Sequence, residues 1–382
     1  MPGLYVHIPF CAAKCAYCDF LSFAKCNAEI EPYMKELLVE LKGYASPSKR
    51  KRFGKKKPVD RPIDTIFFGG GTPTVVPTEL LAEALGAARA DFDVAEGAEI
   101  TIEANPETVD YDGLCVLRQA GFNRISFGVQ SFDDPLLRQI GRIHSAETAE
   151  RAAIYARQAG FENINLDLMF GLPGQNMADW AATLDRAIAL APEHLSCYSL
   201  IVEESTPLGK EENLVLPDDE TDRGMYAMAK ERLAQAGYEQ YEISNFAKPG
   251  FASRHNCMYW TGGDYIGVGL GAHSLLDDQR ICNTDSLVRY LSGDYGREVL
   301  ETLDVMDRRA EFMILGLRMT KGVSESEFQA RFRRSFDQVF GEEIDALMRE
   351  GLLEREGDWL RLTARGVDLS NRVFVRFLST ED

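Results

Sequence analysis

The sequence lacks any long hydrophobic run, and it lacks the basic start and apolar stretch of a secretory signal peptide. None of its apolar segments approaches the roughly 20 residues that a membrane-spanning helix needs. Basic residues are also in deficit, because 42 Lys and Arg stand against 60 Asp and Glu, a formal net charge of −18. We therefore expect a cytoplasmic protein with no nucleic acid among its partners.

Cysteine is sparse outside one short segment. Of the eight cysteines, Cys11, Cys15 and Cys18 form a C-x3-C-x2-C motif, and the others are scattered. Disulfides are rare in a reducing compartment, so clustered thiols predict a metal or redox site there. Three thiolates suit an iron–sulfur cluster with one iron left open, and a zinc ion completed by His7 is the alternative.

Short β-branched runs alternate with amphipathic helical patterns over residues 1–205. The expected strands lie at 3–9, 64–68, 99–103, 124–129, 163–170 and 194–200. The expected helices lie at 28–43, 78–91, 110–120, 133–141, 146–160 and 177–191. Six such βα units predict a parallel sheet covered by helices, either an open doubly wound sheet or a barrel. In both architectures the ligand site lies at the carboxyl ends of the strands.

The alternation weakens after residue 205, which predicts a change of architecture. Over 206–303 we expect a helix at 217–237, a strand at 241–244 and a glycine-rich stretch at 262–271. Over 304–382 we expect a small separate domain. Its expected helices lie at 307–319, 324–332, 336–350 and 363–378, and its expected strands at 353–356 and 359–362. Three helices followed by a hairpin are similar to a winged helix.

The strongly basic segment at 49–57 lies in a stretch that also contains proline and glycine. Its composition predicts a solvated excursion between a helix and the next strand. The alternative is a site for an anionic partner such as phospholipid, through which the protein would associate transiently with a membrane.

The glycine-rich run GGGTP at 69–73 ends the second expected strand, where unsubstituted backbone lets a ligand approach the sheet edge. Five further segments accompany it: YVHIPFC (5–11), TIEANP (101–106), NRISFGVQSF (123–132), IGRIH (140–144) and NLDLMFGLPGQ (165–175). With these motifs the chain resembles the radical S-adenosylmethionine (AdoMet) superfamily. More narrowly, it resembles the group that contains oxygen-independent coproporphyrinogen III oxidase and the HemW-type heme chaperones.

The resemblance implies a partial (β/α)6 barrel followed by a smaller α+β region with a winged-helix-like end. It also implies a [4Fe–4S] cluster on Cys11, Cys15 and Cys18, whose open iron binds AdoMet. The positions that the resemblance implies as AdoMet contacts are Tyr5, Tyr17, Gly70, Gly71, Thr72, Glu103, Gln130, Arg142, Asp167 and His273. Glu103 and Asp167 can accept hydrogen bonds from ribose hydroxyls or the ammonium group, and Arg142 can pair a carboxylate.

Two departures separate the chain from the oxidase pattern. The oxidase carries a fourth cysteine two residues after the third, and Phe20 occupies that position here. The oxidase also has a substantial segment before its first strand, whereas the first strand expected here begins at residue 3. Both features are typical of HemW-type proteins.

The segment at 255–260 matches the H-N-x-x-Y-W motif of HemW-type proteins. Histidine can ligate heme iron, and Tyr or Trp can stack on a porphyrin. The candidate heme contacts are His255, Tyr259 and Trp260, with Cys257 as a further iron ligand. The alternative is that His255 and Trp260 pack the end of the barrel or touch AdoMet.

We expect a heme chaperone that binds heme, a [4Fe–4S] cluster and AdoMet, receives electrons from a donor, and transfers heme to acceptor proteins. One alternative is an oxygen-independent coproporphyrinogen III oxidase, against which Phe20 argues. The other is a heme-binding protein with a vestigial cluster, against which the intact cysteine motif and the run at 69–73 argue.

Overall fold

The computed structural model describes residues 2–45 and 61–378. Six parallel strands follow one another through the sheet in chain order. They are β1 (Gly3–Ile8), β4 (Ile63–Gly70), β5 (Val94–Ala104), β6 (Arg124–Gln130), β7 (Asn163–Phe170) and β8 (His194–Ser199). A doubly wound sheet reverses its strand order at a switch point, and these strands do not, so the arrangement is that of a barrel.

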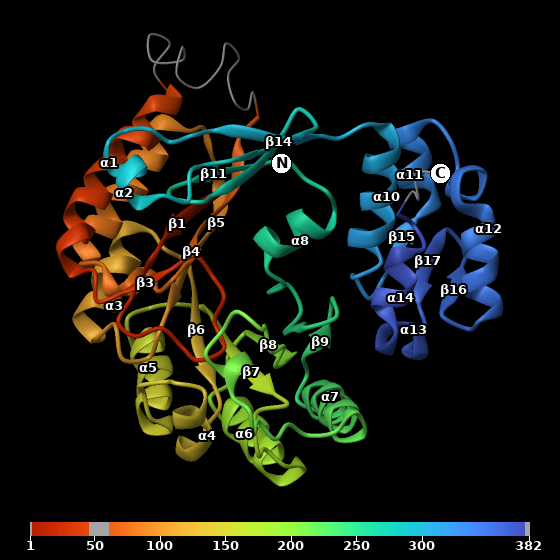
Figure 1. Cartoon of the computed structure of the whole chain (residues 1–382), viewed down its shortest axis with the longest axis horizontal. Helices are drawn as coiled ribbons and strands as arrows, with labels where there is room; N and C mark the ends of the chain where they lie inside the picture. Colours follow the sequence, from red (N-terminus) through yellow and green to blue (C-terminus); the bar gives the residue numbers. More distant parts are fainter. Residues whose placement is uncertain (1, 46–60, 379–382) are drawn as a thin grey trace.

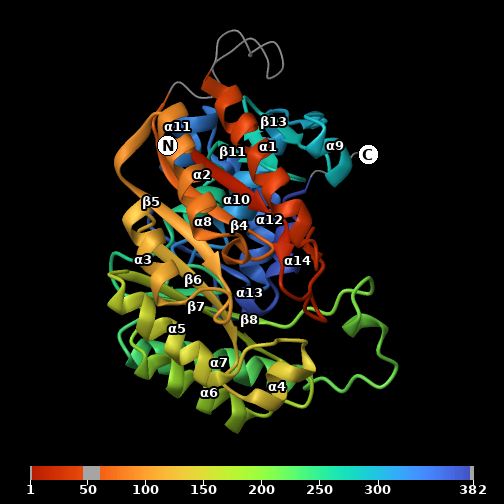
Figure 2. The ribbon, with the colours of Figure 1, turned by 90° about the vertical axis from the view of Figure 1, so that its left-hand side faces the viewer.

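Helices cover the outer face of this curved sheet, as the two ribbon views show (Figures 1 and 2). They are α1 (Asn27–Ala45), α2 (Thr78–Asp91), α3 (Tyr111–Ala120), α4 (Asp134–Gln139), α5 (Ala146–Gln158) and α6 (Met177–Ala189). Side-chain caps fix several of their first turns, for example Asn176 in a capping box at the start of α6. Each expected helix of this region is present within a few residues of its expected bounds.

The sheet continues past the six strands on both sides. Beyond β1 lie the parallel β11 (Tyr265–Val268) and the antiparallel β12 (His273–Leu276), β13 (Gln279–Cys282) and β14 (Glu298–Thr302). Beyond β8 lie β10 (Asn245–Ala247) and β9 (Glu239–Gln240). The second edges of β1 and β8 are therefore taken by other strands, and the six-stranded barrel is partial (Figure 1).

The expected strand at 241–244 is wrong. These residues form the turn between β9 and β10, because Glu242 accepts hydrogen bonds from the amide of Ser244 and the side chain of Asn245. Such local side-chain bonds favour a turn over a strand. The backbone here pairs instead with residues 318–320, through a bridge between Glu242 and Met319. The preceding helix is α7 (Asp219–Gln235).

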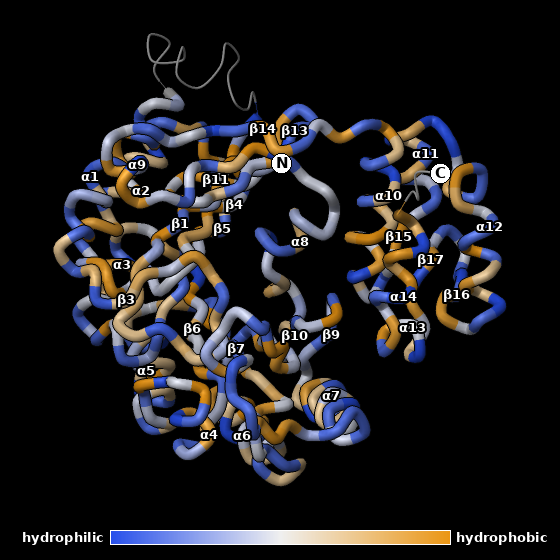
Figure 3. The backbone as a smooth tube through the Cα atoms, viewed as in Figure 1, coloured by the Kyte–Doolittle hydropathy of each residue, from blue (hydrophilic) through white to orange (hydrophobic). Residues whose placement is uncertain are grey.

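The C-terminal part has its own hydrophobic core, distinct from the core of the barrel. Its elements are α10 (Val305–Gly316), β15 (Val323–Ser324), α11 (Glu325–Phe332), α12 (Phe336–Arg349), β16 (Leu353–Glu356), β17 (Trp359–Leu362), α13 (Ala364–Asp368) and α14 (Ser370–Val375). The expected final helix breaks at Leu369, which leaves the helical region with φ −114° and ψ 28°. Figure 1 shows this part as a lobe beside the barrel, and Figure 3 shows hydrophobic and hydrophilic stretches alternating along it. The domain boundaries at 205 and 303 stay a prediction.

In the part of the chain that the structure describes, four short helices lie outside the expected pattern: η1 (Pro73–Val75), η2 (Leu208–Lys210), α8 (Arg254–Trp260) and α9 (Leu287–Leu291). Among the described residues, no helix is both long enough and apolar enough to cross a membrane. The basic segment at 49–57 lies outside the described residues.

Candidate functional site

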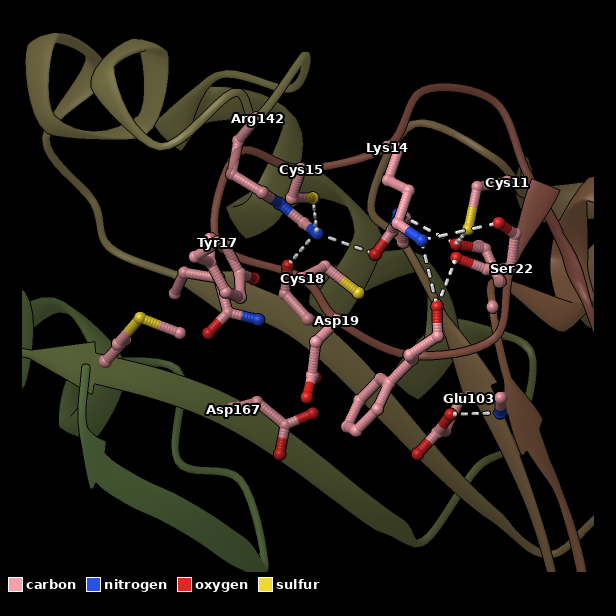
Figure 4. Close-up of a pocket in the computed structure, with 18 of the residues that line it drawn as sticks. Cys11, Lys14, Cys15, Tyr17, Cys18, Asp19, Ser22, Glu103, Arg142 and Asp167 are labelled. Carbon is pink, nitrogen blue, oxygen red and sulfur yellow. Dashed lines mark hydrogen bonds between the residues drawn. The ribbon is translucent and has the colours of Figure 1, made fainter. Parts of the chain in front are cut away.

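A cavity of about 420 Å³ lies at the carboxyl ends of the barrel strands. Figure 4 shows the cysteine loop on one side of it and two carboxyl groups, of Glu103 and Asp167, on the other. The expected site residues that line it are Cys11, Cys15, Tyr17, Cys18, Gly70, Gly71, Thr72, Glu103, Gln130, Arg142 and Asp167. The fold thus brings residues from six separate segments to one space, where parallel barrels place their ligands.

The cysteine loop is held at its ends and at its middle. The short strands β2 (Phe10–Cys11) and β3 (Phe23–Ala24) pair side by side, which closes the loop between them. At the middle, the amide of Ala16 donates to the carbonyl of Ile140 at 3.0 Å, and its carbonyl accepts from Leu208 at 2.8 Å. The Lys14 ammonium donates to the carbonyl of Phe20 at 3.0 Å. These bonds tie the loop to itself and to the residues around it.

Two thiols of this loop accept hydrogen bonds from neighbouring side chains. Thr72 Oγ1 lies 3.7 Å from Cys11 Sγ, and Arg142 Nη1 lies 3.3 Å from Cys15 Sγ. Burial raises the pKa of Cys11 and of Cys18, so metal ligation would release their protons. Donors aimed at sulfur and a cavity beside three thiols fit a [4Fe–4S] cluster held by these cysteines.

A zinc ion completed by His7 does not fit this geometry. Within the described chain, no three His, Cys, Asp or Glu side chains are grouped as ligands of a single ion. His7 also has both ring nitrogens engaged. Nε2 donates to the carbonyl of Leu21 at 3.0 Å, so Nδ1 accepts from the hydroxyl of Tyr5 at 3.0 Å.

The glycine-rich run packs directly on the cysteine loop. The amide of Gly71 donates to the carbonyl of Ile8 at 2.8 Å, and that of Thr72 donates to Phe10 at 2.7 Å. A Cβ on Gly71 would lie 2.6 Å from the carbonyl oxygen of Phe10. Gly70 has φ +115°, a conformation that favours glycine. Backbone rather than side chain therefore forms this wall of the cavity.

The two carboxyl groups across the cavity have different surroundings. Asp167 accepts from Asn165 Nδ2 at 2.8 Å and from Ser126 Oγ at 3.0 Å. Among the described residues, the one hydrogen bond that Glu103 accepts comes from the amide of Gly70, at 3.1 Å. Burial, and then the charge of Asp167, raise the pKa of Glu103 to about 8. Glu103 therefore has accepting capacity left for a ligand.

A buried chain of hydrogen bonds supports Asp167 from inside the barrel. Asn165 Oδ1 lies 2.6 Å from His194 Nδ1, and His194 Nε2 lies 2.7 Å from the hydroxyl of Tyr241. That hydroxyl also accepts the amide of Ser253 at 3.3 Å. Burial lowers the pKa of His194, so the ring is neutral. The chain joins the cavity to the turn between β9 and β10.

Gln130 lies in a strained backbone conformation at the end of β6. Its φ is +66°, which is uncommon for a residue with a side chain. The strand register shifts at this point, and the Tyr198 hydroxyl donates to Gln130 Oε1 at 2.9 Å. A strained residue that faces a cavity is a reasonable functional candidate.

Tyr5 and His273 are not among the described residues that line the cavity. Tyr5 points into the barrel, where it stacks on Phe67. His273 is exposed on β12, with Nε2 3.4 Å from Cys282 Sγ. Conversely, Asn105 and Tyr198 line the cavity but were not predicted as contacts. Asn105 lies in the TIEANP segment, two residues after Glu103, and this position in a motif at a strand end could have identified it as a contact.

The H-N-x-x-Y-W segment lies in α8, of which His255 and Met258 are buried and the other residues of the segment are partly exposed. His255 is 1% exposed, with Nδ1 2.8 Å from Thr65 Oγ1 and Nε2 3.1 Å from the hydroxyl of Tyr259. The ring also stacks on Phe67. The guanidinium of Arg318 lies 4.4 Å from the ring centroid of Trp260. In this conformation the segment packs the barrel, so heme ligation by His255 would require α8 to move.

Comparison with known proteins follows the same division of the chain. Residues 5–187 match the Radical SAM superfamily, and residues 303–369 match the HemN C-terminal domain. The heme chaperone HemW of Bacillus subtilis is 37% identical to this chain, over 99% of each. The heme chaperone HemW of Escherichia coli is also 37% identical, over 99% of this chain and 98% of the relative. The chain belongs to the HemW heme chaperone family.

Membership of the HemW family confirms the resemblance drawn from the motifs. Among solved structures, the coproporphyrinogen III oxidase HemN of Escherichia coli, a radical SAM enzyme, is similar with a TM-score of 0.83 and 25% identity. That match covers 98% of this chain and 90% of the oxidase. It confirms the mixed α/β radical SAM fold with its C-terminal region. The roles of single residues in binding AdoMet or heme stay predictions.

Proposed function

We propose that this chain is a heme chaperone that binds heme, a [4Fe–4S] cluster and AdoMet, and passes heme to acceptor proteins. The observation that carries the proposal is the full-length similarity to proteins named heme chaperone HemW. Phe20 supports it, because this residue stands where the oxidase pattern has a fourth cysteine.

Cys11, Cys15 and Cys18 would hold the cluster and leave one iron without a protein ligand. A bound cluster supplies single electrons for reductive cleavage of AdoMet. Glu103 and Asp167 would accept hydrogen bonds from AdoMet, and the backbone at 69–73 would line its binding site. Phe20 is 65% exposed at the edge of the cavity, where it offers an apolar contact to a further ligand.

The test is an anaerobic hemin titration of the cluster-loaded protein, followed at the Soret band. We expect saturable binding of hemin. We also expect the protein to transfer heme to a heme-free acceptor protein, and this transfer should depend on AdoMet. His255→Ala tests the motif, and Asn256→Ala is the control, because it truncates the neighbouring side chain of α8, which is not a candidate iron ligand. Binding weakened only by His255→Ala would show that α8 opens to heme. Absence of saturable binding by the wild-type protein would refute the chaperone proposal.

A second candidate is oxidative decarboxylation of coproporphyrinogen III. The similarity to the Escherichia coli oxidase over 98% of the chain favours it. An anaerobic assay with the loaded protein, AdoMet and a reductant decides between the two, since formation of protoporphyrinogen would establish the enzyme.

We also propose that the protein is cytoplasmic and meets membranes only transiently, through the basic segment at 49–57. Co-sedimentation with anionic and with neutral vesicles tests this. Wild-type binding to anionic vesicles alone, lost when the seven basic residues become serine, is the expected result. Equal sedimentation of the two proteins would refute it.

A further inference from the structure

Arg142 is bonded to a cluster cysteine although it is nearly buried. The side chain is 9% exposed, and Nη1 donates to Cys15 Sγ at 3.3 Å (Figure 4). The residue was expected to pair the carboxylate of AdoMet. Its terminal nitrogens are instead engaged by protein groups, because Nη2 donates to Asn105 Oδ1 at 2.7 Å and to the carbonyl of Gly128.

Asn105 links this arginine to a second cysteine. Its Nδ2 donates to Thr72 Oγ1 at 3.1 Å, and Thr72 Oγ1 in turn lies 3.7 Å from Cys11 Sγ. One continuous network therefore runs from Cys15 through Arg142, Asn105 and Thr72 to Cys11. Two of the three thiols are bound to donors that share one amide side chain. Three segments of the barrel supply these donors, so the network is fixed by the fold.

Donors aimed at cluster sulfurs favour the reduced cluster, because the added electron increases the negative charge on sulfur. A guanidinium donates a charge-assisted hydrogen bond, which is stronger than a neutral one. The low dielectric of a nearly buried site strengthens it further. Arg142 should therefore act on the cluster more strongly than Thr72 does.

We propose that Arg142, oriented by Asn105, sets the reduction potential of the cluster through its hydrogen bond to Cys15. Arg142 and Asn105 are positioning residues in this role and take part in no covalent step. The inference rests on the cluster of the proposed function, but it does not depend on heme binding.

The test is a redox titration of the loaded protein without AdoMet, monitored by electron paramagnetic resonance. Arg142→Gln should shift the reduction equilibrium at least tenfold toward the oxidised cluster, which is 59 mV for a one-electron couple. Asn105→Ala should shift it in the same direction by less. Lys14→Gln is the matched control, because the Lys14 ammonium is bonded to the carbonyls of Phe20 and Ser22 rather than to sulfur. A shift of equal size in Lys14→Gln would show that charge alone sets the potential.

An unchanged potential in Arg142→Gln, with weaker AdoMet binding, would overturn the inference and leave Arg142 as an AdoMet contact only. If the variants do not bind the cluster, resonance Raman spectra of the cluster-loaded wild-type protein in H₂O and D₂O provide the second measurement. Exchange of the donated hydrogen should shift the Fe–S stretching bands, and unchanged bands would overturn the inference. A wild-type protein without a cluster would refute the inference and the proposed cofactor together. A cluster without heme binding would refute only the chaperone.

Discussion

Replacing Glu103 by glutamine should remove a pH dependence from AdoMet binding. Burial and the neighbouring charge of Asp167 raise the pKa of Glu103 to about 8, and the single amide bond from Gly70 opposes them only in part. A pH of 6 is about two units below this pKa, so ionising the carboxyl group at that pH costs about 2.7 kcal/mol. If AdoMet binds the ionised form, its wild-type dissociation constant should fall about tenfold per pH unit from 6 to 8 and then level off.

Calorimetric titration with AdoMet from pH 6 to pH 9, on the loaded protein without reductant, measures this slope. Glutamine cannot ionise, so the ratio of the two dissociation constants isolates Glu103 and cancels the titration of the AdoMet amino group. Asp167→Asn should move the inflection to lower pH, because the neighbouring charge that raises the Glu103 pKa is lost. Parallel curves for the wild-type protein and Glu103→Gln would refute the reasoning.

Three further changes test the site and the fold. Gly71→Ala should lower cluster content, measured as iron per protein, because its Cβ would lie 2.6 Å from the carbonyl oxygen of Phe10. Cys18→Ala should abolish the absorbance of the reconstituted cluster. Cys26→Ala should retain it, since Cys26 packs against the barrel core outside the cavity. An equal loss of cluster absorbance in the two variants would contradict this assignment. Phe328→Ala should cost about 3–5 kcal/mol in denaturant unfolding, because this fully buried ring is central to the C-terminal core. An unchanged unfolding transition would contradict that packing.

The number of barrel strands could be predicted because each strand is a short buried run followed by an amphipathic helix. Their order could not be predicted from that pattern, because the same alternation fits a doubly wound sheet and a barrel. The start of β5 could not, because residues 94–97 are partly or fully exposed and carry no alternating pattern. They form a strand because Val94 pairs with Ile63. The helix α8 has seven residues, which is too short for helical periodicity to be evident.

The cavity was largely predictable because motif residues at the carboxyl ends of parallel strands must meet there. The partners of each side chain were not. Asn105 bridges Arg142 and Thr72 only because three strand ends converge, and no sequence spacing encodes that contact. The turn at 241–244 was misassigned because its pairing partner lies at 318–320, far along the chain.

The buried chain of hydrogen bonds that runs from Ser253 through Tyr241, His194 and Asn165 to Asp167 has all its donors oriented the same way. Asn165 Oδ1 can only accept, so His194 donates from Nδ1 and must accept at Nε2 from Tyr241. Every hydrogen in the chain therefore points toward Asp167, from the amide of Ser253 onward. The bond dipoles of the chain are therefore aligned, with their positive ends toward Asp167.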